Sequence, residues 1–426
     1  MSATPPAPKD RGVLGWALYD WANSAYATVV VAGFFPVFLK TYWAAELPVT
    51  RSTFYLGLAT SAASLAVAIL APLVGALADR AGWHKRALIV YAATGVVCTL
   101  GLALAGRGQW ELALLLYALG TLGWSGANAL YDALLTSVAD EPDFDRVSAL
   151  GFSLGYLGGG ILFAGCISLT LYPGLLGLPG KAEAVRVGFA ACAIWWAIFS
   201  IPLLRWVRQP APTAEAGEAS LRAALARLLQ TLKTLRSLKT AALFLVAYWL
   251  YIDGVDTIIR MAVDYGLAIG LPDTALITAL LLTQFVGFPA AIAFGALGKR
   301  IGAKGGVLLA LLVYLGVCAF AHGMETATEF YVLAATVGLV QGGVQALSRS
   351  LFARLIPAEQ SAELFGFYNM VGKYAAVIGP TLMGWVAVAT GDPRAGILAV
   401  AGLIVLGGGM LVLIRIPRTP TAEATP

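Results

Sequence analysis

Charge is what this 426-residue sequence has least of. Only 12% of its residues are Asp, Glu, Lys or Arg, whereas 59% are hydrophobic and the mean hydropathy is +0.80. A chain of this composition has too little polar surface to coat a soluble globule. The composition therefore excludes an ordinary soluble domain and predicts a protein of the lipid bilayer.

Residue types that carry chemistry are also scarce. The sequence has two histidines and four cysteines, and Cys98, Cys166, Cys192 and Cys318 lie within apolar runs without metal-type spacing. It contains no phosphate-cradling loop of the Walker type. We therefore expect no enzyme, no metal, no cofactor and no ATP-driven pump, and we expect the cysteines to be buried thiols.

Apolar runs recur along the whole sequence, each long enough to cross a hydrocarbon layer of about 30 Å. The N-terminal segment is Pro-rich and the run behind it is about twice as long as a signal-peptide core, so the first span is expected to remain. The predicted fold class is an all-α integral membrane protein. We predict twelve transmembrane helices, at 13–41, 53–78, 87–105, 110–138, 147–171, 184–206, 241–263, 274–297, 305–322, 328–352, 363–389 and 395–415.

The basic residues are unevenly distributed between the two sides of these spans. Twenty of the 28 Lys and Arg residues lie on the side of the N-terminus, six lie on the opposite side and two lie within spans. Cytoplasmic loops carry the excess of Lys and Arg. We therefore predict a multi-pass protein of the cell (inner) membrane with both termini in the cytoplasm. The net charge of +5 then reflects topology, and we expect no nucleic-acid partner.

The longest polar interruption, residues 207–240, separates six spans from six. It opens with "RQPAPTAEAGEAS", a linker-like composition, and continues as "LRAALARLLQTLKTLRSLK", whose leucines share one helical face. We predict an interfacial amphipathic helix that ties the halves together, with a regulatory role as the alternative. The predicted domains are a six-helix bundle at 1–206, the linker at 207–240, a second bundle at 241–416 and a disordered tail at 417–426.

The two halves resemble each other at their polar positions. "GALADRAGWHK" after span two is echoed by "GALGKRIGAKGG" after span eight, and "NALYDALL" in span four by "QALSRSLF" in span ten, which matches Asp132 with Arg349. "GWALYDWANSAY" in span one lies over "YWLYIDGVDTII" in span seven, which matches Asp20 with Asp253. Paired six-span repeats are the plan of a secondary transporter, whose substrate lies between the repeats near the bilayer midplane.

The loop "GALADRAGWHKR" resembles the signature between spans two and three of the major facilitator superfamily. The segments "YDWANSAY", "DRVSALGFSLGYLGGG", "IDGVDTII" and "GLVQGGVQALSRSLFARLIP" resemble one branch, the autophagy-related vacuolar effluxer family with its bacterial "unknown major facilitator" relatives. The resemblance covers roughly residues 12–415 and implies a twelve-helix facilitator fold of two pseudo-symmetric bundles. It also implies transport of small solutes, with amino acids suggested by the vacuolar relatives.

The sequence departs from the superfamily pattern at two places. Trp83 stands where the loop usually has Arg, which leaves His84, Lys85 and Arg86 as the basic cluster, and we expect His84 to be solvated there. Span five lacks the Gly-Pro pair expected of drug/proton antiporters, although Gly379 and Pro380 occur in span eleven. The second departure counts against a drug exporter.

Asp20 is the first candidate site residue because an ionised carboxylate in hydrocarbon costs at least ~2.5 kcal/mol. It should face a wet cavity or a partner inside the bundle. Asn23 shares its helix face, and Trp16 and Tyr26 are expected to line an amphipathic pocket. The alternative for Asp20 is a hydrogen-bonded structural carboxyl.

Span seven supplies the second cluster, in which Asp253, Asp256 and Arg260 follow at i, i+3 and i+7. Asp256 and Arg260 have the spacing of an intrahelical ion pair, which as an alternative would only fix helix packing. Lys373 in span eleven would meet an anionic substrate or pair with a span-seven aspartate. We predict that the two clusters border one central cavity. Asp20 or Asp253 would take up a proton there if transport is proton-coupled.

Gating is expected at the cytoplasmic ends of the helices. In the signature loop, Gly75 permits close helix approach, Asp79 accepts hydrogen bonds from a neighbouring helix N-terminus, and Arg80 pairs with a carboxylate, Asp140 being the first choice. Asp132 and Arg349 are expected to attract each other when the cytoplasmic side closes. The alternative is that each pairs within its own half, for instance Arg349 with Glu359 or Glu363.

These patterns together predict a secondary active transporter. It would move a small polar or zwitterionic, amino acid-like solute by alternating access, with proton coupling left open. The alternatives are a drug or cation exporter of the same fold and a non-transporting membrane receptor or scaffold. The expected partners are a small-molecule substrate, the bilayer and, in the coupled case, protons, with the protein as a monomer.

Overall fold

The computed structural model describes residues 9–47, 49–209, 238–268, 271–390 and 393–415. Within these ranges the chain is helical and contains no strand. Most of the predicted linker, residues 210–237, and the predicted tail at 417–426 lie outside the described residues. The linker positions 207–209 and 238–240 are described.

The first half contains six membrane-length segments. The first is a continuous rod in which α1 (Lys9–Ala25) passes into the π-helical η1 (Tyr26–Phe34), α2 (Phe35–Phe38) and the π-helical η2 (Leu39–Trp43). The others are α3 (Val49–Ala81), α4 (His84–Leu104), α5 (Trp110–Ala133) with the short α6 (Leu135–Val138), α7 (Phe144–Leu171) and α8 (Lys181–Trp206). Two short 3₁₀ turns, η3 (Glu141–Asp143) and η4 (Pro173–Leu176), flank α7.

The second half repeats this order with one fusion. Its helices are α10 (Lys239–Ala268), α11 (Asp273–His322), α12 (Ala327–Leu355), α13 (Ser361–Thr390) and α14 (Pro393–Leu413), with the 3₁₀ turn η5 (Ala358–Gln360) before α13. The helix α11 is two helices joined at Gly302, whose φ of 79° is a conformation that glycine adopts without strain. Its repeat counterpart Gly82, with φ 64°, forms the turn between α3 and α4.

The twelve predicted spans all fall on helices. Ten helical segments of the described residues are long and apolar enough to cross a membrane, and one of them is the double helix α11. The 30-residue α13 supplies the remaining span. The predicted all-α membrane fold is therefore confirmed.

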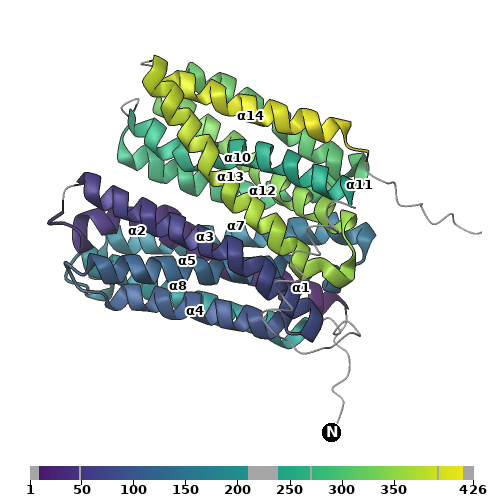
Figure 1. Ribbon diagram of the computed structural model, residues 1–426. Coiled ribbons are helices and arrows are strands. Elements are labelled where there is room, and N and C mark those ends of the chain that lie inside the picture. The colour runs from purple at the N-terminus through teal and green to yellow at the C-terminus, as the bar shows by residue number, and fades with distance from the viewer. Residues whose placement is uncertain (1–8, 48, 210–237, 269–270, 391–392, 416–426) are drawn as a thin grey trace, which may run out of the picture.

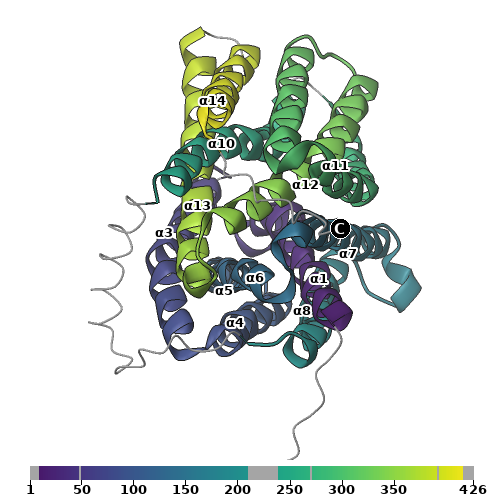
Figure 2. The ribbon, with the colours of Figure 1, turned by 90° about the vertical axis from the view of Figure 1, so that its right-hand side faces the viewer.

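The two halves form two bundles that lie side by side, the first at the bottom and the second at the top of Figure 1. Figure 2 views the same arrangement along the helices. The halves meet where α3 packs on α13 and where α7 packs on α11, with α12 also against α7. We call the end that carries the start of α1 and the α3–α4 connection the motif end; it lies at the right of Figure 1.

Basic residues of the repeated loops cap helices in both halves. The Lys85 ammonium donates to two carbonyls at the end of α8, at 2.6 and 2.9 Å. The Lys304 ammonium donates to two carbonyls at the end of α14, at 2.9 and 2.8 Å. Carbonyls at a helix C-terminus lack intrahelical partners and carry partial negative charge, so a cation stabilises them. The similarity between the two halves thus extends from the sequence to the contacts in the structure.

Candidate substrate site and gate

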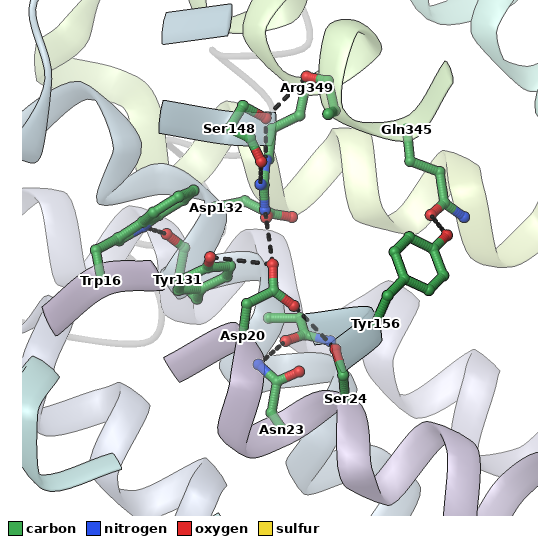
Figure 3. Close-up of polar contacts among 12 residues, drawn as sticks. Trp16, Asp20, Asn23, Ser24, Tyr131, Asp132, Ser148, Tyr156, Gln345 and Arg349 are labelled. Carbon is green, nitrogen blue, oxygen red and sulfur yellow. Dashed lines mark hydrogen bonds and ion pairs between the residues drawn. The ribbon is translucent and has the colours of Figure 1, made fainter. Parts of the chain in front are cut away.

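Arg349 of α12 is a cation buried between the two halves, with 2% of its surface exposed. Its side chain leaves the second half and inserts into the first (Figure 3). The Nε–H donates to Ser148 Oγ at 2.8 Å, and one terminal nitrogen donates to the Ser148 carbonyl at 2.8 Å. The other terminal nitrogen lies 3.0 Å from Asp132 Oδ1 and 3.7 Å from Asp20 Oδ2. One guanidinium therefore joins three helices of the opposite half.

Aromatic rings enclose this guanidinium. Its central carbon lies 4.7 Å from the ring centre of Trp16, 5.4 Å from that of Tyr131 and 4.3 Å from that of Phe152. Trp16 stacks on Tyr131 with ring centres 4.4 Å apart, and its indole N–H donates to the Tyr131 carbonyl. A desolvated cation gains from such ring faces. Trp16 thus packs against both Arg349 and Tyr131 and helps to enclose the cation.

Asp20 accepts hydrogen bonds at both of its oxygens. Ser24 Oγ donates to Oδ1 at 3.0 Å, and the Tyr131 hydroxyl donates to Oδ2 at 3.1 Å (Figure 3). Asp132 accepts from Arg349 and also from the Asn369 amide of α13 at 3.0 Å. Two carboxylates, 6% and 8% exposed, therefore share one guanidinium. If both are ionised, the group of Asp20, Asp132 and Arg349, which we call the inter-half cluster, carries one net negative charge.

The contact between Asp132 and Arg349 decides between the two arrangements expected for Arg349. The arginine pairs across the halves, as the sign reversal at matched repeat positions predicts, and not with a glutamate of its own half. Its role in gating stays a prediction. Sequence reasoning missed Ser148 and Tyr131, because nothing in their spacing marks which residues face a helix 200 positions away.

A second polar layer lies beside the cluster, on the side away from the motif end. Asn23 donates through Nδ2 to Asn128 Oδ1 at 2.8 Å, which joins α1 to α5. The Tyr156 hydroxyl of α7 donates to Gln345 Oε1 of α12 at 3.3 Å, which joins the two halves (Figure 3). The two bonds thus connect α1 with α5 and α7 with α12 next to the inter-half cluster.

Asp253 is engaged within its own half. Its carboxylate accepts from the Gly379 N–H of α13 at 2.9 and 3.0 Å, and only 2% of the residue is exposed. Thr257, one turn later, lines a small apolar cavity inside the second half. Asp253 thus bonds α10 to α13, and its expected place beside the substrate stays a prediction.

The remaining predicted site residues are Tyr26, Asp256, Arg260 and Lys373, of which the structure describes the side chains of the first two. Tyr26 bonds Thr121 Oγ1 at 3.1 Å and packs inside the first half. Asp256 is half-buried and already engaged. The side chains of Arg260 and Lys373 lie outside the described ones, so their expected roles stay predictions.

The signature loop makes its contacts across the halves. A Cβ on Gly75 would lie 2.5 Å from the carbonyl oxygen of Ala362, so α3 and α13 approach backbone to backbone. The Asp79 carboxylate accepts from the N–H groups of Ala362 and Glu363, at 3.2 and 2.8 Å, at the start of α13. These are the contacts expected of Gly75 and Asp79.

His84 and Arg80 of this loop do not show the contacts expected of them: one differs from expectation and the other has no described side chain. His84 is 1% exposed and its Nε2 lies 2.8 Å from Asp79 Oδ1, so the expectation that it is solvated is wrong. With Trp83 in the place of the usual arginine, the next residue turns inward onto the aspartate. The side chain of Arg80 lies outside the described ones, and Asp140 is engaged.

A further charged group crosses the halves at the motif end and was not predicted. Asp145, at the start of α7, accepts from Arg354 at 2.7 Å and from Ser350, both of α12. Lys299 of α11 lies 3.2 Å from Asp143. The only sequence signal for these residues is a charge near a helix end. Among the described residues, no group of three or more His, Cys, Asp or Glu side chains is arranged to bind a metal ion.

Two helical bundles with a buried polar cluster between them define a secondary transporter of the major facilitator type. The sequence profile of the family described as vacuole effluxer Atg22 like matches residues 45–423. The uncharacterized MFS-type transporter YxiO of Bacillus subtilis (strain 168) is 38% identical over 413 residues, which cover 96% of each chain. This chain therefore belongs to the Atg22-like family of major facilitator transporters, and not to an enzyme family.

More distant relatives agree with this assignment. Autophagy-related protein 22-2 of Aspergillus clavatus is 26% identical over 287 residues, covering 61% of this chain and 46% of that protein, so this chain spans less than half of its length. The human organic anion transporter MFSD10 has a TM-score of 0.71 at 16% identity and covers 95% of this chain and 100% of its own. The proton:xylose symporter XylE has a TM-score of 0.72 at 12% identity and covers 95% and 94%. The two solved structures show the fold alone.

Proposed function

We propose that this protein is a proton-coupled secondary transporter that moves a small polar or zwitterionic, amino acid-like solute across the cell membrane by alternating access. One observation carries the proposal: Arg349 of the second half is bound by two carboxylates of the first. An ion pair between two bodies that rock against each other holds one state and must break in the other. A receptor or scaffold has no need of such a separable pair.

The motif end is assigned to the cytoplasm in this proposal, because most Lys and Arg residues lie on that side. The contacts at Gly75, Asp79, Arg349 and Arg354 then close the cytoplasmic side. The state described is accordingly outward-facing, with both termini inside the cell. We propose a monomer, since each half finds its partner within the same chain.

Asp20 is the proposed proton acceptor. Asp132 has the shorter contact with Arg349, 3.0 Å against 3.7 Å, and Asp253 is held by a backbone N–H. A proton on Asp20 would remove the surplus negative charge of the inter-half cluster, which is costly in a buried setting. Protonation would also weaken one of the two attractions that hold Arg349 in the first half.

Reconstitution into proteoliposomes tests the proposal. With an imposed pH gradient, the wild type is expected to accumulate labelled solute from an amino acid mixture. Asp20→Asn should abolish accumulation but keep solute exchange, and Asp10→Asn, at an exposed position of the same helix, is the matched control. Accumulation in Asp20→Asn with an unchanged pH dependence would refute proton coupling. Accumulation of organic cations alone would favour the drug or cation exporter.

A further inference from the structure

The helices α5 and α12 carry matched polar stripes. Trp124, Asn128 and Asp132 follow at four-residue intervals on α5, and Gln341, Gln345 and Arg349 do so on α12. Residues four apart lie on one helix face. Since Asp132 and Arg349 meet between the halves, the other members of each stripe face the same space, one and two turns further from the motif end.

Exposure changes sharply along these stripes. Between positions 340 and 353 of α12, only Gln341 and Gln345 are half-buried and every other residue is buried. Between positions 123 and 135, only Trp124 and Asn128 are half-buried. Arg349 and Asp132 are 2% and 8% exposed. The stripes are thus partly accessible at their amides and become buried at the inter-half cluster, and we call the amide positions Asn128, Gln341 and Gln345 the wall.

Some donor and acceptor atoms of the amides on this wall make no hydrogen bond to the described residues. Asn128 and Gln345 each accept one bond through oxygen, from Asn23 and Tyr156, and among the described residues their NH₂ groups have no partner. The Oε1 atom of Gln341 is buried and also has no partner within the described part of the chain. A buried oxygen without a partner, such as that of Gln341, costs free energy unless water or a ligand completes it.

The charged groups of the inter-half cluster, by contrast, are already hydrogen-bonded to other residues of the protein. Every terminal nitrogen of Arg349 has a partner in the first half, and both carboxylates of the cluster accept several bonds. The wall therefore offers neutral donors at Asn128 and Gln345 and a neutral acceptor at Gln341. A group that both accepts and donates hydrogen bonds, as a carboxamide or a hydroxyl group does, complements these donors and this acceptor without an unpaired charge.

We infer that Asn128, Gln341 and Gln345 form the subsite that recognises a neutral hydrogen-bonding group of the transported solute, a carboxamide or hydroxyl. The inference rests on the proposed function and adds to it which part of the solute is recognised and by which residues. The charged cluster closes the space beneath the solute and does not select it.

Ligand-induced thermal stabilisation of the purified full chain tests this subsite with four probes. L-Glutamine carries a carboxamide, D-mannitol carries hydroxyls, L-glutamate replaces the amide with a charge and L-leucine has no polar side chain. We expect L-glutamine or D-mannitol to stabilise the wild type at lower concentration than the other two, since a ligand that binds only the folded state raises its stability.

Variants of the wall locate the binding. Gln341→Leu and Gln345→Met should each weaken the preferred probe by roughly 2- to 10-fold, the effect of one lost hydrogen bond. Gln109→Leu, at an exposed loop amide, should leave binding unchanged. Tyr156→Phe removes only the donor to Gln345 and serves as a second variant if either substitution disturbs folding.

Three outcomes would overturn the inference: preference for L-leucine or L-glutamate, equal binding in the wall variants and the wild type, or stabilisation by none of the four probes. None of them by itself refutes alternating access, which is judged separately by the distance between the halves at the motif end. That distance is measurable without any ligand.

Discussion

Each half places an aspartate and a hydroxyl residue, one helical turn apart, against a glycine of its own fifth helix. The sets are Asp20, Ser24 and Gly155 in the first half and Asp253, Thr257 and Gly379 in the second. The packing is the same, but the partners of the carboxylates differ. Asp20 approaches Arg349 of the opposite half, whereas Asp253 accepts from the Gly379 N–H of its own half.

The residue after each glycine also differs. Pro380 follows Gly379 inside the continuous helix α13 and has no backbone N–H. The Asp253 carboxylate accepts from the N–H of the residue before this proline. Tyr156 follows Gly155 and leaves α7 regular, so Asp20 is compensated by side chains. One repeat position thus bonds within its own half and the other bonds to the opposite half.

The largest effect is expected from removing the cation between the halves. Arg349→Met leaves Asp20 and Asp132 buried without it, which should cost about 3–5 kcal/mol in the closed state. The midpoint of thermal unfolding should fall and accumulation should be lost. The exchanged pair Asp132→Arg, Arg349→Asp should restore part of both. Arg146→Gln, at a 65% exposed side chain, is the control and should behave like the wild type.

A smaller and different effect is expected at the bond between Asp253 and the Gly379 N–H, which lies within one half. Asp253→Asn removes a charge-assisted hydrogen bond to Gly379, which should cost about 1.5–3 kcal/mol. Because the bond lies within one half, thermal stability should fall while the pH dependence of transport stays that of the wild type. Thermal unfolding and proteoliposome uptake at several pH values check both parts. A shifted pH dependence in Asp253→Asn would remove the distinction between the two aspartates.

The smallest of these effects is expected at the close contact between α3 and α13. In Gly75→Ala the new Cβ meets the backbone at Ala362, which cannot rotate away, and the overpacking should cost about 1–3 kcal/mol. The cost applies only when the halves meet, so a cysteine introduced at the motif end by Glu359→Cys should react faster with a water-soluble thiol reagent. Gly57→Ala on the same helix, with no neighbour within 4 Å, is the matched control. Equal reactivity in both variants would show that the contact does not hold the end closed.

The sequence predicts the framework of this molecule well, because hydrophobic run length and repeated loops are local signals. The spans, the paired halves and the contacts of Gly75 and Asp79 follow from such signals. The sign reversal between Asp132 and Arg349 indicates the inter-half pair, with pairing inside each half as the alternative that the sequence leaves open. In each case a residue type at a matched repeat position constrains its neighbour.

Partner choice in the tertiary structure is what the sequence leaves open. The spacing of Asp253 does not reveal that the Gly379 N–H of α13 bonds its carboxylate, and the neighbours of His84 do not show that it turns inward. The amides at Gln341 and Gln345 look like ordinary polar positions until their exposure is compared with that of Arg349. Such facts depend on which helices meet, and local periodicity carries no information about that.

One distance tests the central claim that Arg349 holds the motif end closed between halves while Asp253 acts within one. Spin labels would be placed at Trp83→Cys and Glu359→Cys, two exposed positions of opposite halves at the motif end, after replacement of the four native cysteines. We predict a short distance in this background, a longer one after Arg349→Met and no change after Asp253→Asn. An unchanged distance in Arg349→Met, or equal lengthening in both variants, would contradict the account.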